Sequence, residues 1–143
     1  MVALTQDRNT PIYLDDMRSQ PMAAATKIFA GSIVMRNAAG YMIKGATAVG
    51  SFAVGRAEDQ ADNSAGALGA LNVRYRPGVF QYANSSAGDL ITQADVGTKC
   101  WVVDDQTVAK TNGTATRSPA GIVEGVDAGG VWIRLDENIN RAT

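Results

Sequence analysis

The side chains that most often carry out chemistry are scarce in this chain. It contains no histidine and a single cysteine, Cys100. Histidine is the usual general base and the commonest metal ligand near neutral pH, so the familiar nucleophile–base pairs cannot be assembled here. Cys100 opens the apolar run Cys100–Val103, which favours burial of the thiol as a small hydrophobic group. We therefore expect a protein that is not an enzyme and that binds no cofactor.

Carboxylates are the remaining candidates for acid–base or metal chemistry. Asp104 and Asp105 are adjacent, but a catalytic carboxylate pair needs a matched partner at a set distance. The polar residues that follow them indicate a turn between Val103 and Val108. A second acidic group lacks the alternating spacing of an EF-hand loop, which indicates a solvated loop without a bound metal. That group consists of Glu58, Asp59, Asp62 and Asn63.

Two segments partly match the patterns of phosphate-binding and nucleic-acid-binding sites. Gly45–Gly50 resembles the first half of a phosphate-binding loop, but Ser51 and Phe52 stand where a lysine and a hydroxyl residue are required. The segment Arg74–Arg76 combines cations with Tyr75, as single-strand binders do. The simpler interpretation is a strand whose arginines face water. A formal charge of −1 adds no general attraction to nucleic acid or to an anionic membrane.

Short apolar runs separated by turn residues predict that this chain is built from strands. Pro77-Gly78, Asn37–Gly40 and the Gly-rich C-terminal third punctuate these runs, as expected for antiparallel hairpins. Thr92, followed by Gln93 and Asp95, predicts one helical turn, the only helix expected. The pattern indicates an all-β protein, a small β-sandwich or barrel of jelly-roll-like form. Its β-domain is expected over residues 26–135, followed by a polar C-terminal tail over residues 136–143.

Residues 1–25 differ from the rest and predict an extended N-terminal arm. They show neither a helical nor a strand period of apolar residues, and Pro11 and Pro21 interrupt them. A short strand could form at Ile12–Leu14. The arm is more apolar than a solvated tail usually is, so docking onto a partner and local packing or disorder are both open interpretations. Its candidate interface residues are Ile12, Tyr13, Leu14, Met17 and Met22.

Trp132 is the second candidate for an interface. In the run Val131–Leu135, alternation places Trp132 and Arg134 on one face of a strand and the three aliphatic residues on the other. The aliphatic face suits the core, so Trp132 and Arg134 are expected to face outward as an intersubunit contact. Trp132, like Trp101 in its own β-branched run, is expected to anchor either the core or a subunit interface.

The sequence shows neither a membrane-spanning segment nor a signal peptide. No run of 18 apolar residues occurs, and the N-terminus lacks the basic start and apolar stretch of a signal peptide. These observations predict a chain that stays in the cytoplasm where it is made and that has no membrane partner.

Several segments together resemble the capsid cement, or head decoration, proteins of tailed bacteriophages, particularly those of Mu-like transposable phages. The segments that carry the resemblance are 25–31, the Val79-Phe80 hairpin region, 104–109, 117–123 and 130–133. The resemblance implies a β-sandwich or barrel that binds the outside of an assembled shell and bridges major capsid protein subunits. It brings no catalytic residues with it.

The expected function is therefore structural: a virion protein on the outer capsid surface, made in the host bacterial cytoplasm. Its expected partners are the phage major capsid protein and itself, as a homo-oligomer, with a trimer favoured over a dimer and no nucleic acid or membrane. Two alternatives stay open. One is a small nucleic-acid-binding β-barrel that uses Arg74, Tyr75 and Arg76, and the other is a tail or baseplate β-domain.

Overall fold

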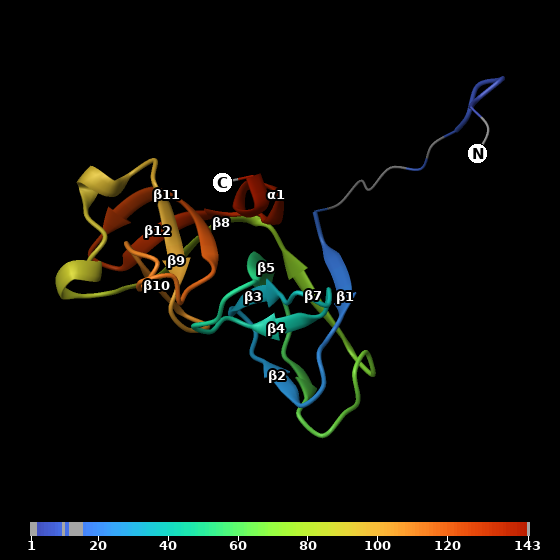
Figure 1. Cartoon of the computed structure of the whole chain (residues 1–143), viewed down its shortest axis with the longest axis horizontal. Helices are drawn as coiled ribbons and strands as arrows, with labels where there is room; N and C mark the ends of the chain where they lie inside the picture. The colour runs from blue at the N-terminus through green and yellow to red at the C-terminus, as the bar shows by residue number, and fades with distance from the viewer. Residues whose placement is uncertain (1–2, 10, 12–15, 143) are drawn as a thin grey trace.

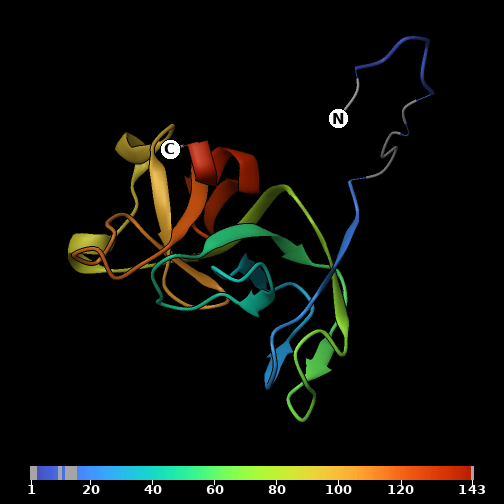
Figure 2. The same cartoon turned by 45° about the vertical axis from the view of Figure 1, so that its right-hand side comes forward.

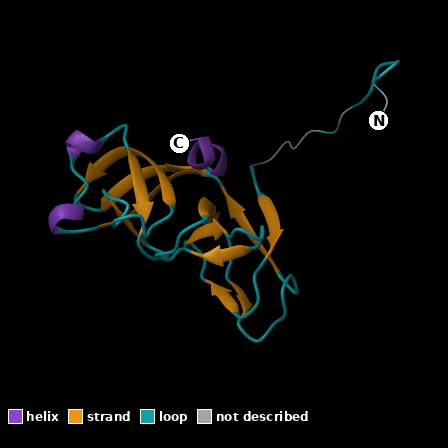
Figure 3. Cartoon of the chain, viewed as in Figure 1, coloured by secondary structure: helices purple, strands orange, loops and turns teal. Residues whose placement is uncertain are grey.

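The structure, a computed structural model, describes residues 3–9, 11 and 16–142. Two β-rich lobes follow one another along the chain (Figure 1). The first, here called the sheet lobe, contains β1 (Arg18–Pro21), β2 (Thr26–Ile28), β3 (Ile33–Arg36), β4 (Met42–Lys44), β5 (Phe52–Ala57), β6 (Ala61–Asn63) and β7 (Asn72–Arg76). The second, the barrel lobe, contains β8 (Gly78–Asn84), β9 (Lys99–Val102), β10 (Thr107–Ala109), β11 (Pro119–Asp127) and β12 (Gly130–Leu135). The all-β prediction is confirmed (Figure 3).

The barrel lobe is a closed five-stranded barrel in the order β10-β8-β12-β11-β9. All of its strand pairs are antiparallel except β10 with β8, which run parallel and pair only at Thr107 with Ala83 and Val108 with Asn84. Gly130 begins β12 with a positive φ of 140°, and a Cβ at that position would lie 2.3 Å from the carbonyl oxygen of Tyr82. Only glycine therefore allows β8 and β12 to approach so closely at this corner.

The sheet lobe is a five-stranded sheet in the order β1-β7-β5-β3-β4, beside the two-stranded ribbon of β2 and β6. Met22 nearly closes this sheet on itself. Its N–H donates to the carbonyl of Leu71 beside β7 at 2.9 Å, and the next N–H, of Ala23, donates to the carbonyl of Met42 in β4 at 2.9 Å. The residues directly after β1 thus join the two ends of the sheet order.

This arrangement corrects the expected boundary between arm and β-domain at residue 25. β1 pairs with β7 from Arg18 to Pro21, so the ordered body begins well before Thr26. Figures 1 and 2 show residues 3–9 lying away from both lobes. The expected strand at Ile12–Leu14 lies outside the described residues.

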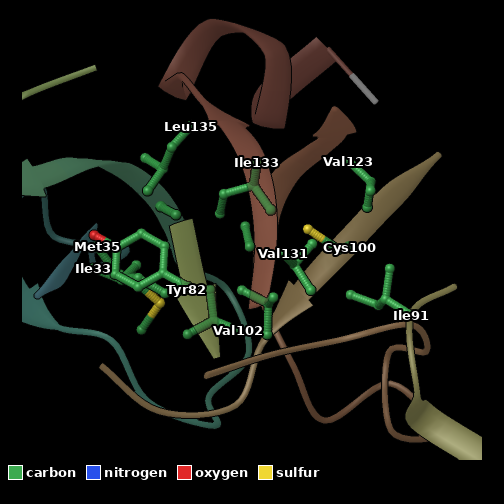
Figure 4. Close-up of a cluster of buried hydrophobic side chains, with 13 residues drawn as sticks. Ile33, Met35, Tyr82, Ile91, Cys100, Val102, Val123, Val131, Ile133 and Leu135 are labelled. Carbon is green, nitrogen blue, oxygen red and sulfur yellow. The ribbon is translucent and has the colours of Figure 1, made fainter. Parts of the chain in front are cut away.

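Two clusters of buried side chains form the core. The smaller cluster lies inside the sheet lobe and includes Met22, Ile28, Val34, Met42 and Val54. The larger cluster fills the barrel, and Ile33, Met35 and Ala53 of the sheet lobe belong to it (Figure 4). Because one cluster takes residues from both lobes, the two lobes form one continuous body.

Short helices lie at the margins of this body. The turn predicted at Thr92 is confirmed: Gln93–Asp95 form a 3-10 helix, and the Asp95 carboxylate accepts hydrogen bonds from the N–H and the hydroxyl of Thr92 at 2.8 and 3.1 Å. A second 3-10 turn spans Ala87–Asp89. Among the described residues, no helix has the length and apolar character that crossing a membrane requires.

The segment expected to be a polar tail instead forms helix α1 (Glu137–Ala142). Asn140 is 2% exposed, and its side-chain amide donates to the carbonyls of Ala53 in β5 and Ala120 in β11, at 2.7 and 3.1 Å. Arg36 of β3 forms a two-pronged ion pair with Glu137, at 2.9 and 3.1 Å. These polar contacts hold α1 against both lobes.

Candidate interaction surface

Trp132 and Arg134 lie on the outer face of the barrel, as the alternation of β12 predicts. Val131, Ile133 and Leu135 are fully buried, whereas 39% of Trp132 is exposed. Arg134 pairs with Glu124 of the neighbouring β11 at 2.7 Å, so its charge is balanced across the strands. This face therefore presents a large aromatic side chain on the same strand as a balanced ion pair.

The indole of Trp132 is held in place by Asp127. Its Nε1–H donates to one carboxylate oxygen of Asp127 at 2.9 Å, while the side chain of Gln81 and the N–H of Gly129 donate to the other, both at 2.8 Å. The hydrogen bond from Trp132, followed by those from backbone N–H groups, lowers the pKa of Asp127 below its usual range. The carboxylate is thus ionised at neutral pH and fixes an aromatic side chain that would otherwise sample several rotamers. A fixed aromatic loses less entropy when a partner covers it.

A groove runs between the two lobes beside this face. It consists of two hollows of about 560 and 480 Å³ that share Gly31, Gln81 and Tyr82. We call it the interlobe groove. Phe29, which is 52% exposed, borders one hollow, and Phe80 and Trp132 border the other.

Two contacts shape the interlobe groove. The Tyr82 hydroxyl donates to the carbonyl of Gly31, another lining residue, at 2.9 Å and so connects the barrel with the sheet lobe. The guanidinium of Arg56, which pairs with Glu58 at 2.6 Å, lies 4.4 Å from the centre of the Phe80 ring. The groove therefore combines aromatic surface with a cation that is already paired and stacked.

Trp101, the other tryptophan, lies half-buried on β9, where the Lys99 ammonium stands 4.7 Å from its ring centre. Its neighbours Cys100 and Val102 point into the barrel core. Burial raises the pKa of the Cys100 thiol to about 12, in keeping with its predicted role as a small hydrophobic group.

Of the candidate residues of the arm, only Met17 and Met22 lie in the described part of the chain. Ile12, Tyr13 and Leu14 lie outside the described residues. Met17 is half-buried where the body begins. Met22 is fully buried in the core of the sheet lobe, so its assignment to a capsid or oligomer interface is wrong as long as the body is folded.

Most of the carboxylates considered for chemistry accept structural hydrogen bonds or form ion pairs. Asp104 accepts a hydrogen bond from the N–H of Gln106 at 2.9 Å, within the predicted turn that connects β9 to β10. In the acidic loop, Asp59 pairs with Arg74 at 2.6 Å and Asn63 donates to two backbone carbonyls. Within the described ranges, no group of three or more potential ligands could hold a metal ion.

The Arg74–Arg76 segment offers no aromatic platform on its surface. Tyr75 is 5% exposed and packs in the core of the sheet lobe. Arg74 pairs with Asp59, and Arg76 approaches Glu58 at 3.7 Å. A base could not stack on Tyr75 without opening that core.

The sequence predicted that Trp132 faces outward, but it did not predict the other residues of this surface and of the groove beside it. Asp127, Gln81 and Phe29 come from three separate segments, and only the fold brings them near one another. The sole local signal was the turn sequence Asp127–Gly130, in which an aspartate side chain commonly bonds the backbone two residues on. Comparisons of this chain with protein-family models, with curated proteins and with solved structures found no match.

Proposed function

We propose that this protein is a structural component of a phage virion that decorates the capsid and stabilises it by bridging major capsid protein subunits. The observation that carries the proposal is Trp132, a large aromatic side chain held toward solvent by Asp127 on the outer face of a closed barrel. Tryptophan is among the residues that most often dominate protein–protein interfaces. The likeness of several segments to cement proteins supports the same reading.

A rigid protein that binds across subunit boundaries can stabilise a capsid against internal pressure. A shell filled with DNA is under outward pressure, and contacts that span subunit boundaries oppose separation. A single interface of this kind can be modest, because many copies on one shell act together. The shared core of the two lobes provides a rigid body, and the N-terminal segment provides reach: 15 residues extend at most about 50 Å at about 3.3 Å per residue.

The test is to add purified protein to heads that lack it and to measure both occupancy and the temperature at which the shells release DNA. Wild-type protein should bind and raise that temperature. Trp132→Ala should bind more weakly, and Leu90→Ala, which alters a similarly exposed side chain in the loop between β8 and β9, should bind like wild type. If both variants decorate and protect the heads equally, Trp132 does not contact the shell.

The two alternative functions are separated by further observations. Binding of single-stranded DNA at moderate salt would favour a nucleic-acid-binding barrel, although the burial of Tyr75 argues against the segment first considered for it. Purification with tails instead of heads would favour a tail or baseplate domain.

A further inference from the structure

Among the described residues, no strand pairs with one edge of β8 along most of its length. On its other side, β8 pairs with β12 from Gly78 to Tyr82. β10 covers the remaining edge only at Ala83 and Asn84. The barrel therefore closes at one end of β8, and the rest of this edge faces the interlobe groove.

The register identifies the backbone groups on the open edge. The N–H of Ala83 donates to Gln106 on the β10 side at 2.8 Å. Because successive residues of a strand direct their backbone groups to opposite sides, those of Gln81 and Val79 also point to that side, and those of Tyr82 and Phe80 point to β12. In the described part of the chain, no hydrogen bond reaches the backbone of Val79 or Gln81 from this side. Both residues line the groove.

From these observations we infer that the interlobe groove is an acceptor site for an extended peptide, which adds a strand to the open edge of β8. The backbone groups of Val79 and Gln81 would bond to the incoming strand, and Phe29 and Trp132 would contact its apolar side chains. Strand addition of this type combines main-chain hydrogen bonds with side-chain pockets.

The occupant that fits is the N-terminal segment, residues 1–15, of a second copy of this chain. Residues 3–9 and 11 are exposed, and residues 3–9 lie away from their own body (Figures 1 and 2). The sequence Ile12-Tyr13-Leu14 supplies apolar side chains. A reach of up to about 50 Å exceeds the body's radius of gyration of about 14 Å, enough to cross to a neighbour.

This contact is heterologous, since the segment of one copy meets the groove of the next. Heterologous contacts close into rings when the rotation between copies allows it, and a trimeric ring is the smallest beyond a dimer. The inference rests on the proposed self-association of the protein. The two experiments below need no shell, and a repeat of the first with shells added separates a second copy from the shell protein as the occupant.

The first experiment measures amide hydrogen exchange of the full chain by NMR, at protein concentrations above and below the dissociation constant for self-association. The amides of Val79 and Gln81 should exchange at least about tenfold more slowly in the associated protein, and removal of residues 1–15 should abolish this protection. The amides of Phe80 and Tyr82 are bonded to β12 and serve as controls, because they should be protected in every sample.

The second experiment blocks the open edge. Gln81→Pro removes the N–H that faces the groove without removing a bond to β12, and Gln81→Ala is the matched control that keeps this N–H. Sedimentation should show association weakened at least about tenfold in the proline variant relative to the alanine variant. Protected Phe80 and Tyr82 amides would verify that the proline variant is folded.

Three results would overturn the inference. Fast exchange of Val79 and Gln81 in the associated protein would mean that no strand is added. Protection that does not change with concentration would show that each copy fills its own groove. Protection that appears only after shells are added would assign the groove to the shell protein, whereas a failure to bind shells, with the protection intact, would count against the proposed function alone.

Discussion

Met22 should be one of the most sensitive positions for folding, although it lies in a segment expected to be an arm. Met22→Ala removes three heavy atoms from a side chain that is fully buried in the core of the sheet lobe. At about 0.8 kcal/mol for each methylene-sized group, the lost transfer free energy is about 2.4 kcal/mol, and the remaining cavity brings the total to about 3 kcal/mol. For a chain of this size, that loss lowers the melting temperature by about 6–12 °C.

Urea and thermal unfolding followed by circular dichroism would measure this loss. Leu4→Ala is the control in the same terminal region, because Leu4 is 72% exposed and its truncation should change the free energy of unfolding by less than about 0.5 kcal/mol. Two truncations extend the test: removing residues 1–15 should leave the melting temperature nearly unchanged, and removing residues 1–24 should lower it more than Met22→Ala does, because β1 is lost as well. If Met22→Ala costs less than about 1 kcal/mol, the sheet lobe is not closed through Met22.

Three further predictions concern titration and reactivity. Burial opposes ionisation of Glu137, but hydrogen bonds from Arg36 and Arg141 outweigh this effect and lower the pKa of Glu137. Glu137→Gln should therefore lower the free energy of unfolding by on the order of 1 kcal/mol at pH 7. The free energies of unfolding of variant and wild type should converge as the pH falls through that lowered pKa. Cys100, whose pKa burial raises to about 12, should resist iodoacetamide at pH 8 in the native protein and react once urea unfolds it; native labelling within minutes would contradict its burial. The fraction of protein attached to heads should change little between about pH 6 and 8. The chain has no histidine, and the pKa values of Asp127, Glu137 and Cys100 are shifted away from neutrality. A steep change near pH 6.5 in a pelleting assay would point to titrating groups on the shell.

Sequence patterns correctly predicted those strands, strand faces and turns that depend only on residues close together in the sequence. The alternation of Val131, Ile133 and Leu135 with Trp132 and Arg134 is a property of one strand, and its two faces were predicted correctly. The turn at Thr92 was predicted because an acceptor three residues on can bond its backbone N–H.

The features that were missed depend on partners far away in the sequence. Residues 137–142 show no apolar helical stripe, and α1 is held by Arg36 and by the carbonyls of Ala53 and Ala120. Met22 is buried because its own N–H and that of Ala23 bond to the carbonyls of Leu71 and Met42 on either side. The interlobe groove likewise exists only once both lobes have formed.

The pairing of β8 with β12 has a consequence for how the chain is synthesised. β8 ends at Asn84 and β12 at Leu135, so β8 leaves the ribosome 51 residues before its principal partner is complete. At about 5–20 residues per second, the edge of β8 that pairs with β12 stays without that partner for about 3–10 seconds in each nascent chain. During this interval the exposed strand edge can bind chaperones or pair wrongly with other nascent chains on the same mRNA. Slower translation between residues 84 and 135 should therefore increase aggregation even where the finished protein is stable.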